Sequence, residues 1–105
     1  RHINRIIEYI HTHIDDDLKR NDIAAAVFLT PDYITKIFKE QMHLSLKEYI
    51  LQEKINIARD RLRTTDMSIN EIATLGGFTN FSHFSQVYKK YTGNSPNKER
   101  KQTSP

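Results

Sequence analysis

The sequence predicts an all-α protein, with seven helices forming two similar units joined by a long helix. Three observations predict it. Apolar residues recur at three- and four-residue spacing through most of the chain. Only three glycines and three prolines interrupt its 105 residues. One pattern of residues also occurs twice along the chain, as expected for an internal repeat.

The composition restricts the class of protein. With 105 residues, 37% of them apolar, and a formal net charge of +3, the chain can bury the core of one domain and carries a mild basic excess. Because it has no cysteine, disulfides, thiolate metal sites and cysteine nucleophiles are excluded. No apolar run approaches the roughly 18 residues of a membrane span, and no signal-type segment opens the chain, so we expect a cytoplasmic protein. Its first residue is arginine, and we expect a piece of a longer protein.

The first two helices are predicted by an apolar stripe and by a run of acids. A helix over 1–13 is indicated by four isoleucines at helical spacing: Ile3, Ile6, Ile7 and Ile10. The run Asp15-Asp16-Asp17 predicts the acidic, cap-forming start of a second helix that continues to Val27. Such a run is also typical of ordinary solvated surface.

The next three helices begin at recognisable caps. Thr30-Pro31 predicts a helix over 31–41, with the hydroxyl as N-cap and proline at the first helical position, where its missing N–H costs nothing. A fourth helix, ending near residue 63, and a fifth, ending near residue 75, follow two matches to the capping box. In this motif a serine and a glutamate three positions later bond each other's backbone N–H. The two pairs are Ser45 with Glu48 and Ser68 with Glu71.

The last two helices follow glycine and proline signals. Gly76-Gly77 can adopt the positive φ of a C-cap and ends the fifth helix. Asn80 caps a sixth helix that stops before Gly93. Ser95-Pro96 repeats the cap-plus-proline signal and opens a short seventh helix, after which 102–105 should fray.

The two halves of the chain can be aligned on one another. Three groups of residues match, at offsets of 52, 49 and 50: Ile3, Ile6 and Ile10 with Ile55, Ala58 and Leu62; Asp22-Ile23-Ala24 with Glu71-Ile72-Ala73; and 34–39 with 84–89. In each copy an alanine-bearing helix is joined by a short turn to a helix with an apolar inner face, which is helix-turn-helix geometry. We expect one domain over 1–105, with these parts: a first helix-turn-helix unit (1–44), a linker helix (45–63), a second unit (64–101) and a frayed tail (102–105).

Helix-turn-helix geometry predicts a DNA-reading surface. The second helix of the motif lies in the major groove and packs its inward residues on the first helix. The inward residues here are Ile34, Ile37, Phe38, Phe84, Val87 and Tyr88. The outward residues are the base-contact candidates: Asp32, Thr35, Lys36, Phe81, Ser82, Ser85 and Gln86. The lysines near the ends of these helices suit phosphates: Lys39, Lys89 and Lys90.

The sequence offers no catalytic or metal-binding pattern. No nucleophile has a base at motif spacing, no glycine loop cradles a phosphate, and the carboxylates are scattered. His11 and His13 stand two apart on a helix and so point to different faces, which argues against a metal site. We therefore expect neither an enzyme nor a cofactor or metal. A helical protein-interaction module without DNA binding remains the alternative.

Motifs in both halves resemble one family. The second half contains Ile69-x-x-Ile72-Ala73, Gly77-Phe78, 80–85, 88–90 and Gly93-x-Ser95-Pro96; the first contains Asp22-Ile23-Ala24, 29–34 and Phe38-Lys39. In order and spacing these resemble the DNA-binding domain of AraC/XylS transcription regulators, over nearly all 105 residues. In the residues of both motifs they are most similar to the AraC-type output domains of response regulators in Gram-positive bacteria.

The resemblance implies a homeodomain-like tandem repeat in which the third and sixth helices read double-stranded promoter or operator DNA. It also implies two partners, RNA polymerase and an N-terminal sensor or receiver domain. We add five phosphate-contact candidates: Thr30, Tyr33, Asn80, His83 and Arg100. Tyr33 and His83 serve equally well in turn packing.

Three residues depart from the family pattern. His43 stands where the family usually has glycine, so the third helix ends either without a left-handed residue or with a strained one. Glu99 replaces an aromatic, so we expect the last helix to dock poorly. Asp32 either accepts from a cytosine amino group or is simply favoured by the helix dipole, and we prefer the dipole.

Overall fold

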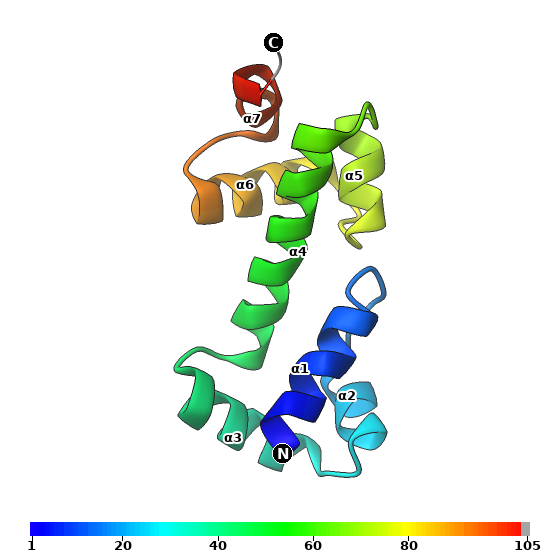
Figure 1. Ribbon diagram of the computed structural model, residues 1–105, viewed down its shortest axis with the longest axis vertical. Coiled ribbons are helices and arrows are strands. Elements are labelled where there is room, and N and C mark those ends of the chain that lie inside the picture. Colours follow the sequence, from blue (N-terminus) through cyan, green and yellow to red (C-terminus); the bar gives the residue numbers. More distant parts are fainter. Residues whose placement is uncertain (104–105) are drawn as a thin grey trace. The chain divides into compact units, whose positions relative to one another are not determined.

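The computed structural model describes residues 1–103, and within that range it contains seven helices and no strand (Figure 1). They are α1 (His2–Thr12), α2 (Arg20–Ala26), α3 (Pro31–Met42), α4 (Leu46–Thr64), α5 (Ile69–Leu75), α6 (Phe81–Thr92) and α7 (Pro96–Thr103). The all-α prediction is confirmed. The last helix continues through Thr103, into the stretch expected to fray, and the rest of that stretch lies outside the described residues. In the described chain no helix combines the length and the hydrophobicity that a membrane crossing requires.

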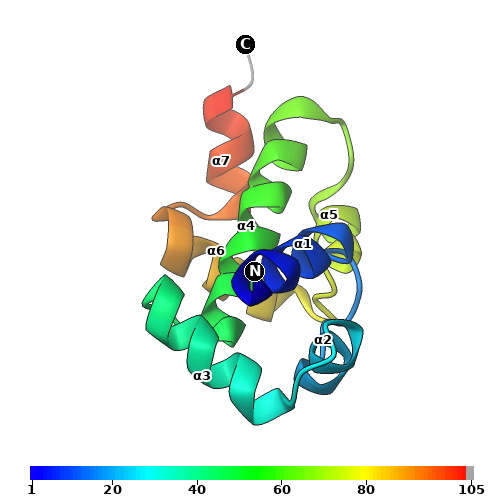
Figure 2. The ribbon, with the colours of Figure 1, turned by 60° about the horizontal axis from the view of Figure 1, so that its bottom comes forward.

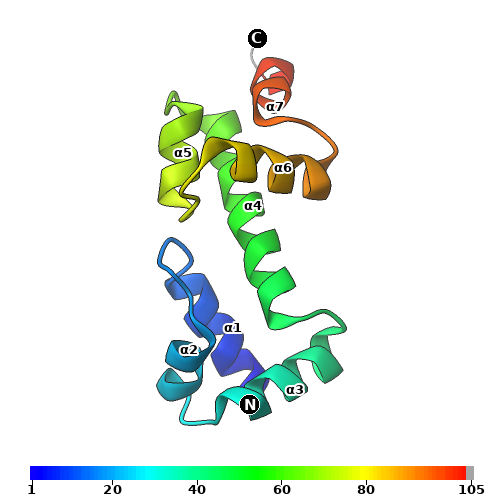
Figure 3. The same ribbon diagram turned by 180° about the vertical axis from the view of Figure 1, so that it is seen from behind.

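The chain forms two compact units, residues 1–53 and 54–105, and the boundary falls inside α4. In the first unit, α1, α2 and α3 pack against one another. Figure 2 shows α3 along the outside of this unit, beside α1 and α2. In the second unit, α6 packs against both α5 and α7 (Figure 3). Each unit therefore holds one helix-turn-helix pair, as the repeat predicts.

Each unit has its own apolar core. In the first, the core is formed by the inner faces of four helices: Ile6, Ile10, Ile23, Ala24, Ile34, Ile37, Phe38, Leu46 and Ile50. In the second it comprises Ile55, Ala58, Leu62, Ile72, Ala73, Phe78, Phe84 and Tyr88. Five of the six predicted inward residues are buried, and Val87 is half-buried. Burying a large apolar side chain stabilises a fold by about 1.5–3 kcal/mol, so these stripes hold α3 and α6 in place.

Five of the predicted N-terminal caps form, those of Thr30, Ser45, Ser68, Asn80 and Ser95. Thr30 accepts a hydrogen bond from the backbone of Tyr33 at 3.2 Å, and Asn80 accepts one from that of His83 at 2.7 Å. Ser95 accepts one from the backbone of Lys98 at 3.1 Å. Both capping boxes are complete, since each serine and each glutamate bonds the other's backbone N–H. These caps satisfy N–H groups that the helix itself leaves unpaired.

The predicted start of the second helix is wrong. The backbone N–H of Asp16 bonds the His13 carbonyl at 2.9 Å, and this turn follows α1 directly. The acidic run therefore belongs to the turn, and α2 begins only at Arg20 after an extended Lys19 that provides no side-chain cap. A local capping preference was overridden here by the turn that buries Ile14 against the core.

Two positions with left-handed backbone distinguish the units. At the end of the second helix of each motif, His43 has φ 62° where the second unit has Gly93 with φ 83°. In the turns of the two motifs, Phe28 has φ 61° where the second unit has Gly77 with φ 85°. A side chain in this region carries strain that glycine avoids, so of the two alternatives for His43 the strained left-handed residue is correct.

Replacing His43 with glycine is expected to raise the free energy of unfolding by about 1 kcal/mol, because the strain is removed and only part of the gain is offset by chain entropy. Urea unfolding measures the change. The matched control is the reverse substitution, Gly93→Ala, which should lower the free energy of unfolding by a similar amount. An added Cβ at Gly93 meets nothing within 4 Å, so that loss would come from the backbone alone. A destabilised His43→Gly variant would show that His43 makes contacts worth more than its strain.

The expectation that Glu99 weakens the docking of α7 is wrong. Its side chain is only 1% exposed and accepts hydrogen bonds from Tyr88 at 2.9 Å, Arg59 at 3.1 Å and Arg63 at 2.9 Å. The carboxylate thus joins α7 to α6 and to the second half of α4. In place of the aromatic side chain that the resemblance implies, α7 carries a buried carboxylate whose charge is paired with two partly exposed guanidinium groups.

Candidate nucleic-acid interface

The two helix-turn-helix motifs have the same turn. In the first, the N–H of Phe28 bonds the Ala25 carbonyl at 3.2 Å and that of Leu29 bonds Ala24 at 3.0 Å. In the second, the equivalent bonds run from Gly77 to Thr74 and from Phe78 to Ala73, both at 3.0 Å. These bonds end the first helix of each motif and direct the chain into the capped start of the second. The position of α3 and of α6 is therefore set within each unit by backbone hydrogen bonds as well as by apolar packing.

The outer face of α3 carries all four outward residues predicted for it: Asp32, Thr35, Lys36 and Lys39. All are exposed. The side chain of Thr35 donates to the Pro31 carbonyl at 3.0 Å, so toward another molecule its oxygen acts as an acceptor and its methyl group as an apolar contact. The face thus combines two ammonium groups with neutral and acidic acceptors, the groups that contact base edges and phosphates.

One residue beside this face, on α2, could not be predicted from the sequence. Arg20, the first residue of α2, places Nη1 at 3.4 Å from Asp32 Oδ1 and at 3.4 Å from Thr35 Oγ1. The missed start of α2 explains the omission, because a helix beginning at the acidic run would put Arg20 in mid-helix. Once α2 is known to begin at this residue, its side chain reaches the first turn of α3.

The outer face of α6 is free of acids. Its base-contact candidates are Phe81, Ser82, Ser85 and Gln86; Phe81 is 42% exposed, Ser82 and Gln86 are exposed, and Ser85 is half-buried. Lys89 and Lys90 are exposed in the last turn. The Nζ of Lys90 lies 5.6 Å from the ring centroid of Tyr91. Compared with α3, this helix has a more uniformly positive end and a more neutral start.

The remaining phosphate-contact candidates differ in their surroundings. Thr30 and Asn80 use an oxygen for capping and keep hydrogen-bond donors on the hydroxyl and the amide nitrogen. The ring of His83 lies 5.6 Å from that of Phe78 and the residue is exposed. Arg100 donates to the carbonyls of Leu62, Met67 and Thr65 around the turn that follows α4. Its guanidinium is thus committed within the second unit.

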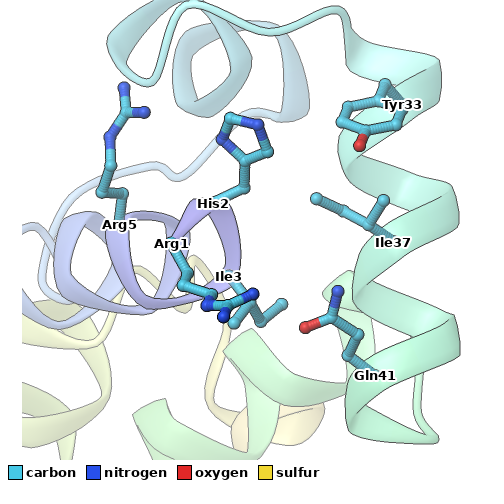
Figure 4. Close-up of a pocket in the computed structure, with 7 residues that line it drawn as sticks. All are labelled: Arg1, His2, Ile3, Arg5, Tyr33, Ile37 and Gln41. Atoms are coloured by element: carbon cyan, nitrogen blue, oxygen red, sulfur yellow. The ribbon is translucent and has the colours of Figure 1, made fainter.

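Tyr33 lines a pocket of about 540 Å³ between α1 and α3. Figure 4 shows its seven lining residues: Arg1, His2, Ile3, Arg5, Tyr33, Ile37 and Gln41. The Tyr33 ring meets that of His2 edge-on at 6.1 Å, and Arg5 donates to the Val27 carbonyl at 2.7 Å. Tyr33 is 42% exposed, so it packs in the unit and still reaches solvent. Both roles considered for it are compatible with this position.

The comparisons with known proteins agree with this geometry. A family model described as a helix-turn-helix domain matches residues 23–102. The Msm operon regulatory protein of Streptococcus mutans is 38% identical over 101 residues, which are 96% of this chain and 36% of that protein. The chain thus spans about a third of the length of this relative.

Solved structures show the same fold. An AraC-type DNA-binding domain-containing transcriptional regulator from Chromobacterium violaceum superposes with a TM-score of 0.93 at 27% identity, over 98% of this chain and 92% of that one. The C-terminal domain of AraT, a response regulator from Geobacillus stearothermophilus, superposes with a TM-score of 0.91 at 27% identity, over 96% and 84%. This chain belongs to the helix-turn-helix domain family, as an AraC-type DNA-binding domain.

Proposed function

We propose that this chain is the DNA-binding part of a bacterial transcriptional regulator and that it reads double-stranded promoter or operator DNA with α3 and α6. One observation carries the proposal. In each unit the second helix of the motif buries an apolar face and exposes polar and cationic residues opposite it. That is the arrangement with which helix-turn-helix proteins enter a major groove. A domain of this family binds DNA and is not an enzyme.

We further propose that the chain works as one domain, over 1–105, whose two units occupy successive major grooves. The support is that the repeat supplies two recognition helices and that α4, which has 19 residues, belongs to both units. A helix of that length is about 28 Å long, close to the ~34 Å of one duplex turn. The prediction is that one molecule protects two adjacent major grooves in a footprint.

The site residues divide into two proposed roles. Lys36 and Gln86 stand at outward positions of α3 and α6 and read base edges, together with the other base-contact candidates. Lys39, Lys89 and Lys90 bind phosphates. For Arg100 we propose a structural role in place of the phosphate contact, since three carbonyls already accept from its guanidinium.

The whole protein has further partners in our proposal. Two relatives named as operon regulatory proteins are about three times as long as this chain, and the AraT match is to the C-terminal domain of a response regulator. We therefore propose an N-terminal sensor or receiver domain, contact with RNA polymerase at the promoter, and a cytoplasmic location, where such a promoter is found.

Alanine at Gln86 or Lys36 is expected to weaken binding to the preferred duplex by about 1–3 kcal/mol and to relax preference at one or two base pairs. Both side chains are exposed, so the fold should be unaffected. The measurement is the affinity of each variant for a set of duplexes in which each position is changed in turn. Lys98→Ala, at an exposed position on α7, is the matched control and should leave base preference unchanged. Uniform weakening on all duplexes would make these residues phosphate contacts instead.

A further inference from the structure

Arg20 and Asp32 form a pair on the surface that the proposed function assigns to DNA. The guanidinium comes from α2 and the carboxylate from the first turn of α3, with 3.4 Å between Nη1 and Oδ1. Half of the Arg20 side chain and 97% of the Asp32 side chain are exposed. The pair therefore lies open to a molecule approaching α3.

Thr35 also accepts a hydrogen bond from this guanidinium. The hydroxyl proton of Thr35 is directed to the Pro31 carbonyl at 3.0 Å, which leaves its lone pairs to accept from Arg20 Nη1 at 3.4 Å. Two acceptors thus share one nitrogen, while a guanidinium has five N–H donors in a planar fork. Both contacts are long and exposed, so the ion pair adds little stability and leaves the fork available to a ligand.

Two partners in DNA match a guanidinium, a phosphate and the O6 and N7 atoms of guanine. The position of Asp32 distinguishes them. A phosphate held by Arg20 would lie beside an exposed carboxylate of the same sign and would be repelled by it. A guanine edge is neutral, and the cytosine paired with it presents an amino group from which a carboxylate accepts.

We propose that Arg20 and Asp32 together read one G·C base pair, with Arg20 donating to guanine and Asp32 orienting Arg20 and accepting from the cytosine amino group. Arg20 is then a specificity-determining residue contributed by the first helix of the motif. The role of Asp32 follows from its partner rather than from the helix dipole. This inference rests on the proposed function and adds a residue to it.

The test compares Arg20→Ala, Arg20→Lys, Asp32→Asn and the double variant Arg20→Ala with Asp32→Asn. The affinity of each variant is measured for the preferred duplex and for duplexes in which every base pair is exchanged in turn. Arg20→Ala should bind the preferred duplex about 10- to 100-fold more weakly than wild type, a loss in the range of a bidentate base contact. On the duplex in which the one G·C pair read by Arg20 is replaced, the same variant should bind almost as tightly as wild type. Arg20→Lys should retain only part of the affinity that Arg20→Ala loses, because an ammonium lacks the planar fork of donors of a guanidinium. Asp32→Asn should relax preference at the same base pair. The double variant should lose less binding free energy than the two single variants added together.

The matched control is Lys19→Ala, which removes the neighbouring exposed charge and should leave preference at that pair unchanged. If Arg20→Ala lost the same affinity on all duplexes, and the slope of log affinity against log salt concentration fell by about one, Arg20 would be a phosphate contact. That result would overturn the inference. Equal or stronger binding by Asp32→Asn, with preference kept, would also overturn it. Failure of the proposed function itself looks different, because wild-type protein would then show no preferred duplex and Gln86→Ala would change nothing.

Discussion

Replacing Glu99 with glutamine is expected to lower the free energy of unfolding by about 3 kcal/mol, one of the largest losses available to a single polar substitution in this chain. The carboxylate is 1% exposed and accepts from Tyr88, Arg59 and Arg63. Glutamine keeps the shape but removes the charge, and it leaves two guanidinium groups around a neutral amide. Urea unfolding at pH 7 measures the loss. Glu8→Gln, at an exposed position of α1, is the control and should change stability by no more than about 0.5 kcal/mol.

The same residue predicts a loss of stability in acid. Burial acts to raise the pKa of Glu99, but the hydrogen bonds from Tyr88 and Arg63 and the charges of Arg59 and Arg63 lower it by more. The pKa in the folded state therefore lies below the ordinary value of 4.5. Folding then favours the carboxylate, so its stabilisation is present above pH 4.5 and is lost as the pH falls through the folded-state pKa.

Wild-type protein should accordingly lose more stability than Glu99→Gln when the pH is lowered from 7 to below that ordinary value. Unfolding curves measured in urea at a series of pH values provide the comparison. Two parallel stability profiles would show that the cluster contributes nothing through its charge. A Glu99→Gln variant as stable as Glu8→Gln would contradict the role of Glu99 in docking α7.

Replacing Phe38 with alanine is expected to lower the free energy of unfolding by about 3–5 kcal/mol, because the ring is fully buried and its removal leaves a cavity. The ring packs edge-on against Tyr49 at 5.2 Å between centroids and belongs to the core of the first unit. A loss of this size approaches the whole stability of many small domains. The variant should therefore populate molecules in which α3 is no longer held in place.

Phe28→Ala is the matched control for this substitution. It removes the same side chain from a position that is 88% exposed, and it keeps a non-glycine residue at the same left-handed backbone, so stability should hardly change. Hydrogen exchange adds a second readout. Because the chain forms two compact units, Phe38→Ala should accelerate exchange in α2 and α3 more than in α5 and α6. Equal acceleration in all four helices would mean that the two units unfold as one.

The features that could be predicted from the sequence are local. Caps such as Thr30 and Asn80 depend on residues within one turn, and the apolar stripes of α3 and α6 follow from helical spacing alone. The acidic run after α1 failed as a cap because the same residue types also suit turns, and the choice was made by the packing of Ile14. Local rules therefore located the recognition helices but not every helix start.

The features that could not be predicted depend on pairs distant in sequence. Glu99 meets Arg59 across 40 residues, and only the folded second unit shows that this acid has partners. Arg20 meets Asp32 across 12 residues, and its position depends on where α2 begins. The outward faces of α3 and α6 were found from periodicity, whereas their neighbours from other helices required the structure.

The most direct test of DNA reading is a salt titration of affinity on two duplexes, one selected from a random library by this chain and one with the same bases in scrambled order. We predict that the logarithm of affinity falls steeply and linearly with the logarithm of salt concentration on both, by about 0.9 for each phosphate neutralised, because we propose that Lys39, Lys89 and Lys90 bind phosphates. We also predict that the selected duplex binds more tightly at every salt concentration, because α3 and α6 read its bases. Affinity that hardly depends on salt and is equal for the two duplexes would contradict DNA reading and favour a protein-interaction module.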